Sequence, residues 1–355
     1  MAKSIRQEIL VSIFEKGIDN NAFFNRKEES IGGLKNLLKI LRLVFYRISF
    51  GPKKQISQSS LLLVWYPLHE KVLSQHSGEE VVLLAQKNSL KGLSFISFVS
   101  LLKILKNIAC IPHNMIRSGL SYDWFFYKTF YSFLEENKVE SLTIAGHYDK
   151  YATWISYLAR DMDIYLTISQ HGANSKYSLP HKIPANRVET FSLAEEGLFK
   201  STILFPENTE FYIKGFKSSL VFLEGKFDRR AVAIVSQPGY EDKVSMIIDT
   251  LRSFDPEMEI IVYSHPADKF RRGNLCIDKK YRCKMVHNER YWDIDFLIVF
   301  TSTLAYDYWS CKSFQGFVIC YYDKNCLVAL YDDERSIIIY PDTYKTQLKE
   351  ILQKK

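Results

Sequence analysis

The sequence predicts an α/β protein made of two doubly wound halves. The first observation is length, because 355 residues exceed the size at which a single hydrophobic core stops growing. The second is composition, because 47% of the residues are hydrophobic, enough to fill two cores. The third is an alternation of strand-like and helix-like runs that restarts near residue 231. Two such halves joined by a linker describe a twin Rossmann-like architecture.

The first half alternates buried strand-like runs with amphipathic helical runs. Strands are expected at 60–66, 81–85, 141–145, 164–169, 188–193 and 211–215. Helices are expected at 29–50, 93–108, 124–136 and 151–160. Residues 216–230 show no clear period and form the best linker. We therefore expect an N-terminal domain at 1–215 and a C-terminal domain at 216–355.

The second half repeats the rhythm. Strands are expected at 231–235, 259–263, 296–300, 317–321 and 336–340. Helices are expected at 242–254, 304–310 and 343–353. Ligands of open parallel sheets bind beyond the carboxyl ends of the strands. The active site is therefore expected in the cleft between the two domains.

Composition narrows the function. The formal charge of +7 suits a nucleic-acid binder, an anionic membrane surface or an enzyme for phosphorylated substrates. The sequence holds no long Lys/Arg run and no zinc-finger pattern, so nucleic acid is not expected as a partner. Six cysteines without a Cys-x-x-Cys pair, and no signal-peptide pattern, suggest a reducing cytoplasm. Without a glycine-rich phosphate loop, nicotinamide cofactors and ATP are disfavoured.

Two segments bear on membranes. The run 92–111 is the most apolar, but Lys103 and Lys106 interrupt it, so it is not expected to span a bilayer. In the predicted helix 29–50, basic residues lie between apolar residues at helical spacing. The apolar set is Leu34, Leu37, Leu38, Leu41, Val44, Phe45 and Ile48. This helix either packs on the core or lies on an anionic membrane.

Three polar strings each follow a strand-like run. They are Gln170-His171-Gly172, Ser264-His265-Pro266 and Thr301-Ser302-Thr303. Strings at the carboxyl ends of strands suggest a cleft for a polar, phosphorylated ligand. The sequence is therefore typical of an enzyme.

The second half supplies candidates for the ligand phosphate. Pro266 cannot continue a sheet, so His265 stays at the strand end, where it either occupies a turn or stabilises a leaving phosphate. Ser302 or Thr303 suits the N-cap of the following helix, and the same hydroxyls suit an anion. The two interpretations of the hydroxyls are compatible.

The first half supplies candidates for a general base. Asp149 begins a predicted helix, either as its cap or as the base that deprotonates an acceptor hydroxyl. His171 is an alternative base. Glu196 follows a predicted strand, where it either stabilises a helix dipole or takes part in catalysis. Candidate acceptor-binding residues are His147, Gln170 and Asn174.

Two Asp-x-Asp strings could hold a divalent cation against a diphosphate. Asp161-Met162-Asp163 and Asp293-Ile294-Asp295 both precede a strand, however. The amino ends of strands lie away from the ligand edge. We therefore expect solvated loop carboxylates at both strings, no metal site and a metal-independent reaction.

With these residues in place, the chain resembles bacterial surface-polysaccharide glycosyltransferases of the GT-B type over residues 140–325. The second half matches best and includes Gln237-Pro238, where Gln237 is a candidate donor-binding residue. His265-Pro266 followed by Ser302-Thr303 looks like the donor-binding signature of bacterial sialyltransferases, which use CMP-sialic acid. In those families the His and the Ser/Thr pair contact the donor phosphate, and an acidic residue is the base. Glu195-Glu196-Gly197 fits the letters of their acidic motif, whereas Tyr148-Asp149 lacks its second acid and glycine.

Gln170-His171-Gly172 points elsewhere within the same chemistry. It is similar to a string in capsule-type Kdo transferases and in polyol-phosphate transferases with CDP-linked donors. These resemblances leave the donor open between CMP-sialic acid, CMP-Kdo and a CDP-linked polyol.

Taken together, the resemblance implies a glycosyltransferase that needs no cofactor. The donor is a CMP-linked nucleotide sugar, with sialic acid preferred, and the acceptor a lipid-linked or surface glycan of lipopolysaccharide, O-antigen or capsule. The expected location is the cytoplasm, with peripheral contact to the inner face of an anionic membrane. The alternatives are a CMP-Kdo transferase, a CDP-polyol phosphotransferase, in which the acceptor attacks phosphorus, and a non-catalytic nucleotide- or glycan-binding protein.

Overall fold

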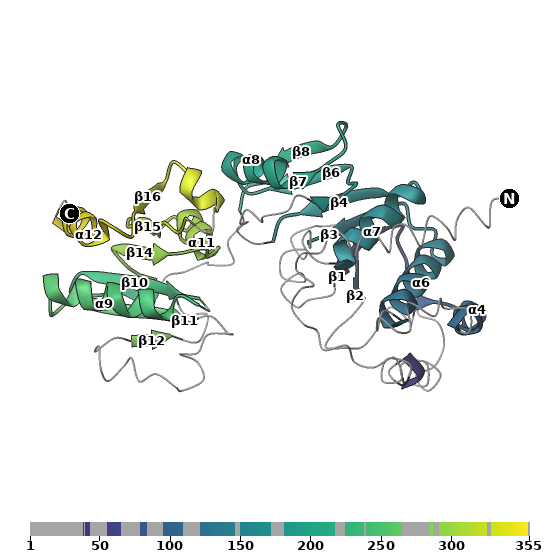
Figure 1. The fold of residues 1–355 in the computed structure, drawn as a ribbon, viewed down its shortest axis with the longest axis horizontal. Helices are drawn as coiled ribbons and strands as arrows, with labels where there is room; N and C mark the ends of the chain where they lie inside the picture. Colours follow the sequence, from purple (N-terminus) through teal and green to yellow (C-terminus); the bar gives the residue numbers. More distant parts are fainter. Residues whose placement is uncertain are drawn as a thin grey trace. The chain divides into compact units, whose positions relative to one another are not determined.

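The chain divides into two compact units, each built on its own parallel sheet (Figure 1). The computed structural model describes residues 38, 40–42, 55–64, 79–83, 95–108, 121–145, 150–171, 181–216, 224–237, 239–264, 284–286, 291–324 and 328–353. The first unit comprises residues 1–171, 179–189 and 200–212, and the second comprises 172–178, 190–199 and 213–355.

The first sheet has six strands in the order β2-β1-β3-β4-β6-β8. Its strands are β1 (Ser60–Val64), β2 (Glu80–Leu83), β3 (Ser141–Ile144), β4 (Tyr165–Ser169), β6 (Arg187–Thr190) and β8 (Glu210–Ile213). The pairs from β2 to β6 are parallel. Successive strands leave β1 in opposite directions, so the strand order reverses between β1 and β3.

The first unit contains the helices α4 (Phe98–Ile108), α6 (Ser121–Glu136) and α7 (Lys150–Asp161). Helix α8 (Leu193–Thr202) is divided between the units, with residues up to 199 in the second. The short strands β5 (His181–Lys182) and β7 (Ile203–Leu204) pair with each other. Helix α7 carries apolar side chains at helical spacing, and Trp154, Ile155 and Leu158 are buried. Helix α7 connects β3 to β4 along the chain, and the burial of this apolar stripe holds the helix against the sheet.

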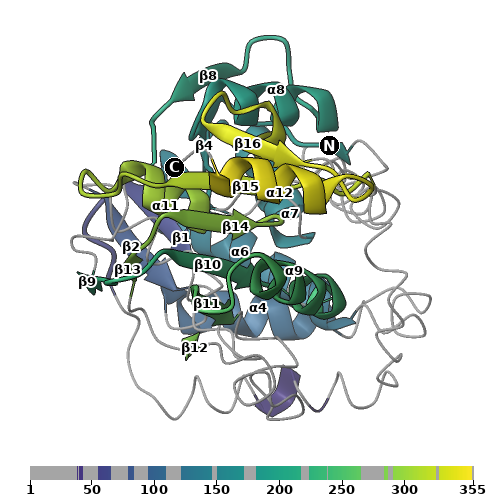
Figure 2. The ribbon, with the colours of Figure 1, turned by 90° about the vertical axis from the view of Figure 1, so that its left-hand side faces the viewer.

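The second sheet has six strands in the order β12-β11-β10-β14-β15-β16, and every pair is parallel (Figure 2). Its strands are β10 (Ala231–Ser236), β11 (Glu259–Ser264), β12 (Lys284–Val286), β14 (Phe296–Val299), β15 (Phe317–Tyr321) and β16 (Ser336–Ile339). This is the Rossmann order, which reverses between β10 and β14. The ligand edge of this unit therefore lies where β10 and β14 end.

Alternate residues of β10 build separate cores on the two faces of this sheet. Val232 and Ile234 pack with α9 (Glu241–Phe254) and α12 (Tyr344–Gln353). Ala233 and Val235 pack with α11 (Leu304–Ser310) and the 3₁₀ helix η4 (Ala329–Asp332). All six residues of β10 are buried, as expected for a central strand covered on both faces. A second ribbon joins β9 (Glu224–Lys226) to β13 (Trp292–Asp293).

The predicted fold class, two Rossmann-like α/β halves, is confirmed. The helix 304–310 and the strand 317–321 have the predicted bounds. Helix α4 begins at Phe98, later than the predicted residue 93, because the Ser97 hydroxyl accepts the Ser100 amide at 3.2 Å and caps it. The predicted linker 216–230 contains the short strand β9.

Helix α8 was predicted only as a first turn after a strand ending at Leu193. The strand β6 ends instead at Thr190, and Leu193 is the first helical residue. The Ser192 hydroxyl accepts the Glu195 amide at 3.3 Å and so starts the helix. Leu193 itself is 73% exposed.

The predicted basic helix 29–50 lies outside the described residues except for residues 38 and 40–42, which are helical. Leu38 is 57% exposed and Leu41 is 40% exposed, whereas Ile40 is fully buried. The choice between packing on the core and lying on a membrane stays a prediction, because the rest of this helix lies outside the described residues. No helix in the described part of the chain is long and apolar enough to cross a bilayer.

Candidate functional site

The carboxyl ends of β10 and β14 are joined by one side chain. Gln237 follows β10, and its Oε1 accepts hydrogen bonds from the Thr301 amide at 3.0 Å and from the Thr301 hydroxyl at 2.6 Å. Thr301 lies just beyond β14. These two strands flank the point where the strand order reverses, which is the ligand position in open α/β sheets. The structure thus brings the predicted residue Gln237 to the polar string 301–303.

The turn after β10 is set by backbone conformation. Gly239 has a φ of +88°, in the left-handed region that side chains other than glycine rarely adopt. Its amide donates to Glu241 Oε2 at 2.9 Å, at the start of α9. The chain can therefore leave β10 and enter α9 within a few residues, which keeps Gln237 at the strand end.

Ser302 and Thr303 stand between β14 and α11, and both are partly exposed. The Ser302 hydroxyl accepts the Leu304 amide at 3.2 Å. Thr303 is the N-cap residue by position, yet within the described residues its side chain makes no cap bond. Since α11 has only seven residues, the hydroxyls, more than a long helix dipole, are the groups suited to an anion here.

Helix α11 is anchored by a buried carboxylate of the predicted acidic string, Glu195, through a contact that the sequence did not predict. The Tyr306 hydroxyl donates to Glu195 Oε1 at 2.9 Å, and Glu195 is fully buried. Burial and the nearby Glu195 carboxylate raise the pKa of Tyr306 far above its ordinary value, so the phenol stays a neutral donor. Tyr306 in turn donates its amide to the Thr303 carbonyl at 2.9 Å. By holding Tyr306 of α11, Glu195 therefore also helps to hold the Ser302-Thr303 turn in place.

The predicted acidic residue Glu196 lies beside this anchor. Glu195 and Glu196 occupy the first turn of α8, and Gly197 follows with open space around it. Glu196 is partly exposed. Residues 190–199 belong to the same compact unit as the string 301–303. The acidic string was assigned to the first domain, but the structure places it in the second unit.

An aromatic and cationic group also lies at the ligand edge of the second sheet. The rings of Tyr240 and Phe300 are 4.6 Å apart, and Lys243 Nζ lies 4.6 Å from the Tyr240 ring centre. Lys243 donates to Asp323 Oδ2 at 2.8 Å, from α9 to the loop after β15. Sequence reasoning missed Lys243. Its signal was available, as the one lysine in the first turn of the helix that follows Gln237-Pro238.

In the first unit, His171 lies at the equivalent edge. Its Nδ1 is 2.5 Å from the Ala145 carbonyl oxygen, just beyond the carboxyl end of β3. Gln170 precedes it and is fully buried, and the backbone N–H of Gln170 donates to the Glu189 carbonyl at 2.9 Å. These contacts place His171 next to the reversal of strand order between β1 and β3. The buried Gln170 side chain is poorly placed to contact an acceptor directly.

The contact with Ala145 determines the tautomer of His171. A backbone carbonyl can only accept, so Nδ1 carries the proton. In the neutral ring Nε2 is then the nitrogen that can accept a proton. An oriented imidazole of this kind has the arrangement of a general base.

Five predicted site residues lie outside the described residues. They are His147, Asp149, Asn174, His265 and Pro266. Ser264, which precedes His265, is the last residue of β11 and pairs in register with Ser236 of β10. The assigned roles of the five residues stay predictions.

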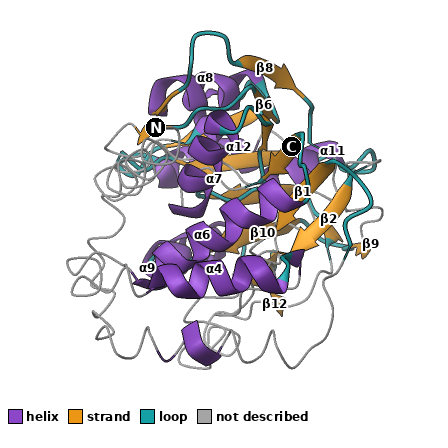
Figure 3. Ribbon diagram, turned by 90° about the vertical axis from the view of Figure 1, so that its right-hand side faces the viewer, coloured by secondary structure: helices purple, strands orange, loops and turns teal. Residues whose placement is uncertain are grey.

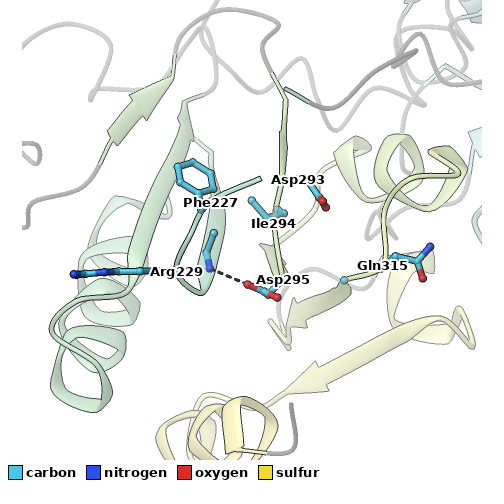
Figure 4. Close-up of a pocket in the computed structure, with 8 residues that line it drawn as sticks. Phe227, Arg229, Asp293, Ile294, Asp295 and Gln315 are labelled. Atoms are coloured by element: carbon cyan, nitrogen blue, oxygen red, sulfur yellow. Dashed lines mark hydrogen bonds between the residues drawn. The ribbon is translucent and has the colours of Figure 1, made fainter. Parts of the chain in front are cut away.

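The Asp-x-Asp strings lie where the sequence placed them, at amino ends of strands. Asp293 and Asp295 line a cavity of about 50 Å³ at the start of β10 and β14 (Figure 4). Asp295 is not a solvated loop carboxylate, since its Oδ2 accepts the Ala231 amide at 2.9 Å. Asp161 pairs with Arg160 at 2.7 Å. Within the described residues, no cluster of three His, Cys, Asp or Glu side chains could hold a metal ion.

In comparisons with known proteins, this chain is similar only to solved structures. No protein-family model matches the sequence, and no curated protein matches it. Anabaena HepE in complex with UDP-glucose superposes with a TM-score of 0.49 and 10% identity, over 83% of this chain and 88% of that one. The UDP-GlcNAc 2-epimerase of Methanocaldococcus jannaschii gives 0.46 and 12%, over 83% and 91%. The lipopolysaccharide outer core galactosyltransferase WaaB gives 0.45 and 8%, over 83% and 90%. The fold assignment rests on the two sheets themselves.

Proposed function

We propose that the chain is a GT-B type glycosyltransferase that holds a nucleotide-sugar donor at the carboxyl edge of the second sheet. One observation carries the proposal. Gln237 and Thr301 join β10 and β14 at the reversal of strand order, and the partly exposed hydroxyls of Ser302 and Thr303 follow at once. This edge is where open α/β sheets bind ligands, and it carries donors suited to a phosphate.

The donor groups act on the leaving nucleotide. Ser302 and Thr303 donate hydroxyl hydrogen bonds to the donor phosphate, and His265 adds a positive charge or a proton at the end of β11. Lys243, held by Asp323, adds a fixed positive charge at the same edge. Preorganised donors of this kind stabilise the negative charge that develops as the phosphate departs.

The preferred base for the acceptor, His171, lies in the first unit. The acceptor hydroxyl oxygen attacks the anomeric carbon, the bond from that carbon to the donor phosphate oxygen breaks, and the nucleotide leaves with the electron pair. His171 Nε2 takes the hydroxyl proton, because the Ala145 carbonyl keeps the other proton on Nδ1. Asp149 and Glu196 are the alternative bases. His147 and Asn174 orient the acceptor.

The donor we prefer is CMP-sialic acid, on the resemblance of the His-Pro and Ser/Thr strings. A CMP sugar carries one phosphate, so the reaction needs neither a divalent cation nor a cofactor. The acceptor is a lipid-linked or surface glycan, used on the cytoplasmic side of the membrane. The alternatives are CMP-Kdo and, because of Gln170-His171-Gly172, a CDP-polyol whose phosphorus is attacked; a non-catalytic nucleotide binder would bind without turnover.

Nucleotide binding to matched variants tests the proposal. We expect CMP to raise the melting temperature of the wild-type chain above the effect of UDP, since a ligand of the folded state stabilises it by about 2.7 kcal/mol at a hundredfold over Kd. Gln237→Ala should weaken binding about tenfold, or ~1.4 kcal/mol. Gln315→Ala, at the opposite edge of the same sheet, should leave binding unchanged.

Three outcomes separate the candidates. Transfer from CMP-sialic acid to a glycan supports the preferred donor, whereas turnover of CMP-Kdo or a CDP-polyol replaces it. Nucleotide binding without turnover of any donor indicates a binding protein. If no nucleotide shifts the melting temperature, or if Gln315→Ala is as harmful as Gln237→Ala, the donor site is not at this edge.

A further inference from the structure

Helix α4 presents an apolar face to solvent. Phe98 is 55% exposed, Val99 61% and Leu102 49%. Figure 3 shows α4 beside α6 in the first unit. The exposed positions 98, 99, 102, 103 and 106 recur at helical spacing, so they share one side of the helix. Large apolar side chains gathered on one exposed face mark an interaction surface.

The opposite side of α4 is firmly seated, so the exposure is not that of a loose helix. Leu101 and Ile104 are buried. At the amino end, the Ser97 amide and hydroxyl donate to the Glu136 carboxylate at 2.7 and 2.8 Å. The Asn137 side chain donates to the Phe95 carbonyl at 3.2 Å. Helix α4 is thus held rigidly on α6 with three large apolar side chains outward.

The charges of α4 indicate what covers this face. The helix contains Lys103 and Lys106, both exposed, and no acidic residue. Its 11 residues correspond to about 16 Å, far less than the ~30 Å of a hydrocarbon core. A short helix with apolar and basic residues side by side therefore fits the plane of an anionic membrane surface.

We propose that α4 docks the protein onto an anionic lipid bilayer. Phe98, Val99 and Leu102 enter the boundary between headgroups and acyl chains, and Lys103 and Lys106 contact the anionic headgroups. The docking stands on α4 alone and does not require the proposed transferase activity. If that activity holds, docking brings the first unit to the surface that carries a lipid-linked acceptor.

Vesicle co-sedimentation tests the docking. The wild-type chain should bind vesicles that contain phosphatidylglycerol more than vesicles of phosphatidylcholine alone, and added salt should weaken binding. Each lysine near an anionic surface contributes about a fivefold factor, so Lys103→Glu with Lys106→Glu should lower the partition coefficient at least about 25-fold. Phe98→Ser with Val99→Ser and Leu102→Ser should lower it about tenfold or more.

The controls carry the same changes elsewhere. Lys345→Glu with Lys349→Glu alters two exposed lysines of α12 and should leave vesicle binding nearly unchanged. Leu193→Ser with Leu204→Ser alters two apolar residues that are 73% and 56% exposed and should also bind normally. All variants should keep the wild-type circular dichroism spectrum and nucleotide-induced melting shift.

The opposing results are equally specific. Equal binding to both kinds of vesicle, or α4 variants that bind like the wild type, would overturn the proposal. So would a dimer in sedimentation that the α4 variants abolish, since a second copy would then cover this face. If the α4 variants lose vesicle binding but still bind nucleotide, the result supports docking. If the wild-type chain binds vesicles but no nucleotide, the result counts against the proposed function alone.

Discussion

Gln237 and Thr301 are 64 residues apart, yet Gln237 Oε1 accepts both the amide and the hydroxyl of Thr301. The same two strands are tied at their other ends, where Asp295 Oδ2 accepts the Ala231 amide at 2.9 Å. The pair β10 and β14 is therefore held by side chains at both edges of the sheet. The carboxyl-edge tie faces the proposed donor, and the amino-edge tie lines a cavity too small for one.

Thr301→Val should lower the free energy of unfolding by about 1 kcal/mol, because Gln237 Oε1 loses one of its two donors while the side-chain shape is kept. Nucleotide affinity should fall with it, since Gln237 is no longer held in one orientation. Chemical denaturation and a nucleotide titration measure the two effects. Thr301→Ser keeps both donors and should behave like the wild type; equal losses in both variants would mean that the hydroxyl bond does not matter.

His171→Ala should lower kcat by roughly a hundred- to ten-thousandfold, the usual contribution of a positioned general base. The nucleotide-induced melting shift should persist, because the donor groups lie in the other sheet. Steady-state kinetics with the best donor provides the measurement, and Glu196→Gln is the comparison. Near-normal turnover in His171→Ala together with a large loss in Glu196→Gln would identify Glu196 of α8, and not His171, as the general base.

Tyr306→Phe should destabilise the protein by about 2 kcal/mol, since the buried Glu195 carboxylate loses a hydrogen-bond donor. Turnover should fall as well, because α11 carries the Ser302-Thr303 turn. Urea denaturation at neutral pH measures the stability, and Tyr340→Phe, at a side chain that is 44% exposed, is the matched control. Equal stability of the two variants would contradict the anchor.

The same tyrosine predicts an alkaline response. The pKa of Tyr306 is raised from its ordinary value of 10.0 by burial, so above pH 10 the unfolded chain loses a proton that the folded chain keeps. Folding stability from this group is complete below pH 10 and declines as pH rises further. Each such tyrosine contributes a slope of up to about 1.4 kcal/mol per pH unit. Tyr306→Phe should therefore flatten the alkaline loss of stability, and an unchanged slope would argue against a buried neutral phenol.

Activity should survive chelation by EDTA, because both Asp-x-Asp strings lie at amino ends of strands and Asp295 already accepts a backbone amide. Asp295→Ala should cost about 1.5 to 3 kcal/mol of stability without changing the metal response, whereas Asp295→Asn keeps an acceptor oxygen. Turnover in EDTA and in added Mg²⁺ or Mn²⁺ provides the check. Activity lost on chelation and restored by either cation would require a metal-dependent mechanism.

Local pattern was sufficient to predict the central strands of both sheets, because each is a continuous apolar run, but it missed the short edge strand β12 (Lys284–Val286) of the second sheet. The start of α8 was missed, although Ser192-Leu193-Ala194-Glu195 has the spacing of a capping box. Here the apolar residues before and after Ser192 suggested a longer strand. The hydrophobic pattern gave the wrong strand end because the hydroxyl of one serine, Ser192, determines where the helix begins.

The contacts of the site could not be predicted in the same way. Glu195 and Tyr306 are 111 residues apart, and their hydrogen bond exists because α8 and α11 meet in the folded chain. The bond from His171 to Ala145 likewise requires β3 and β4 to be paired in register. Sequence indicated which polar residues lie at strand ends, but partners and tautomer follow from tertiary structure.

The division of the chain has a consequence for any attempt to separate the two units. The chain passes between them five times, at residues 171, 178, 189, 199 and 212. A fragment that begins at residue 213 would contain Tyr306 but not Glu195. The complementary fragment would contain the Glu195 carboxylate without the Tyr306 hydroxyl that hydrogen-bonds to it. All six strands of the second sheet lie within the continuous segment 213–355, whereas the segments that build the first unit are interrupted by residues of the second. The second unit also contains residues 190–199, so it cannot complete its packing without residues that precede its first strand.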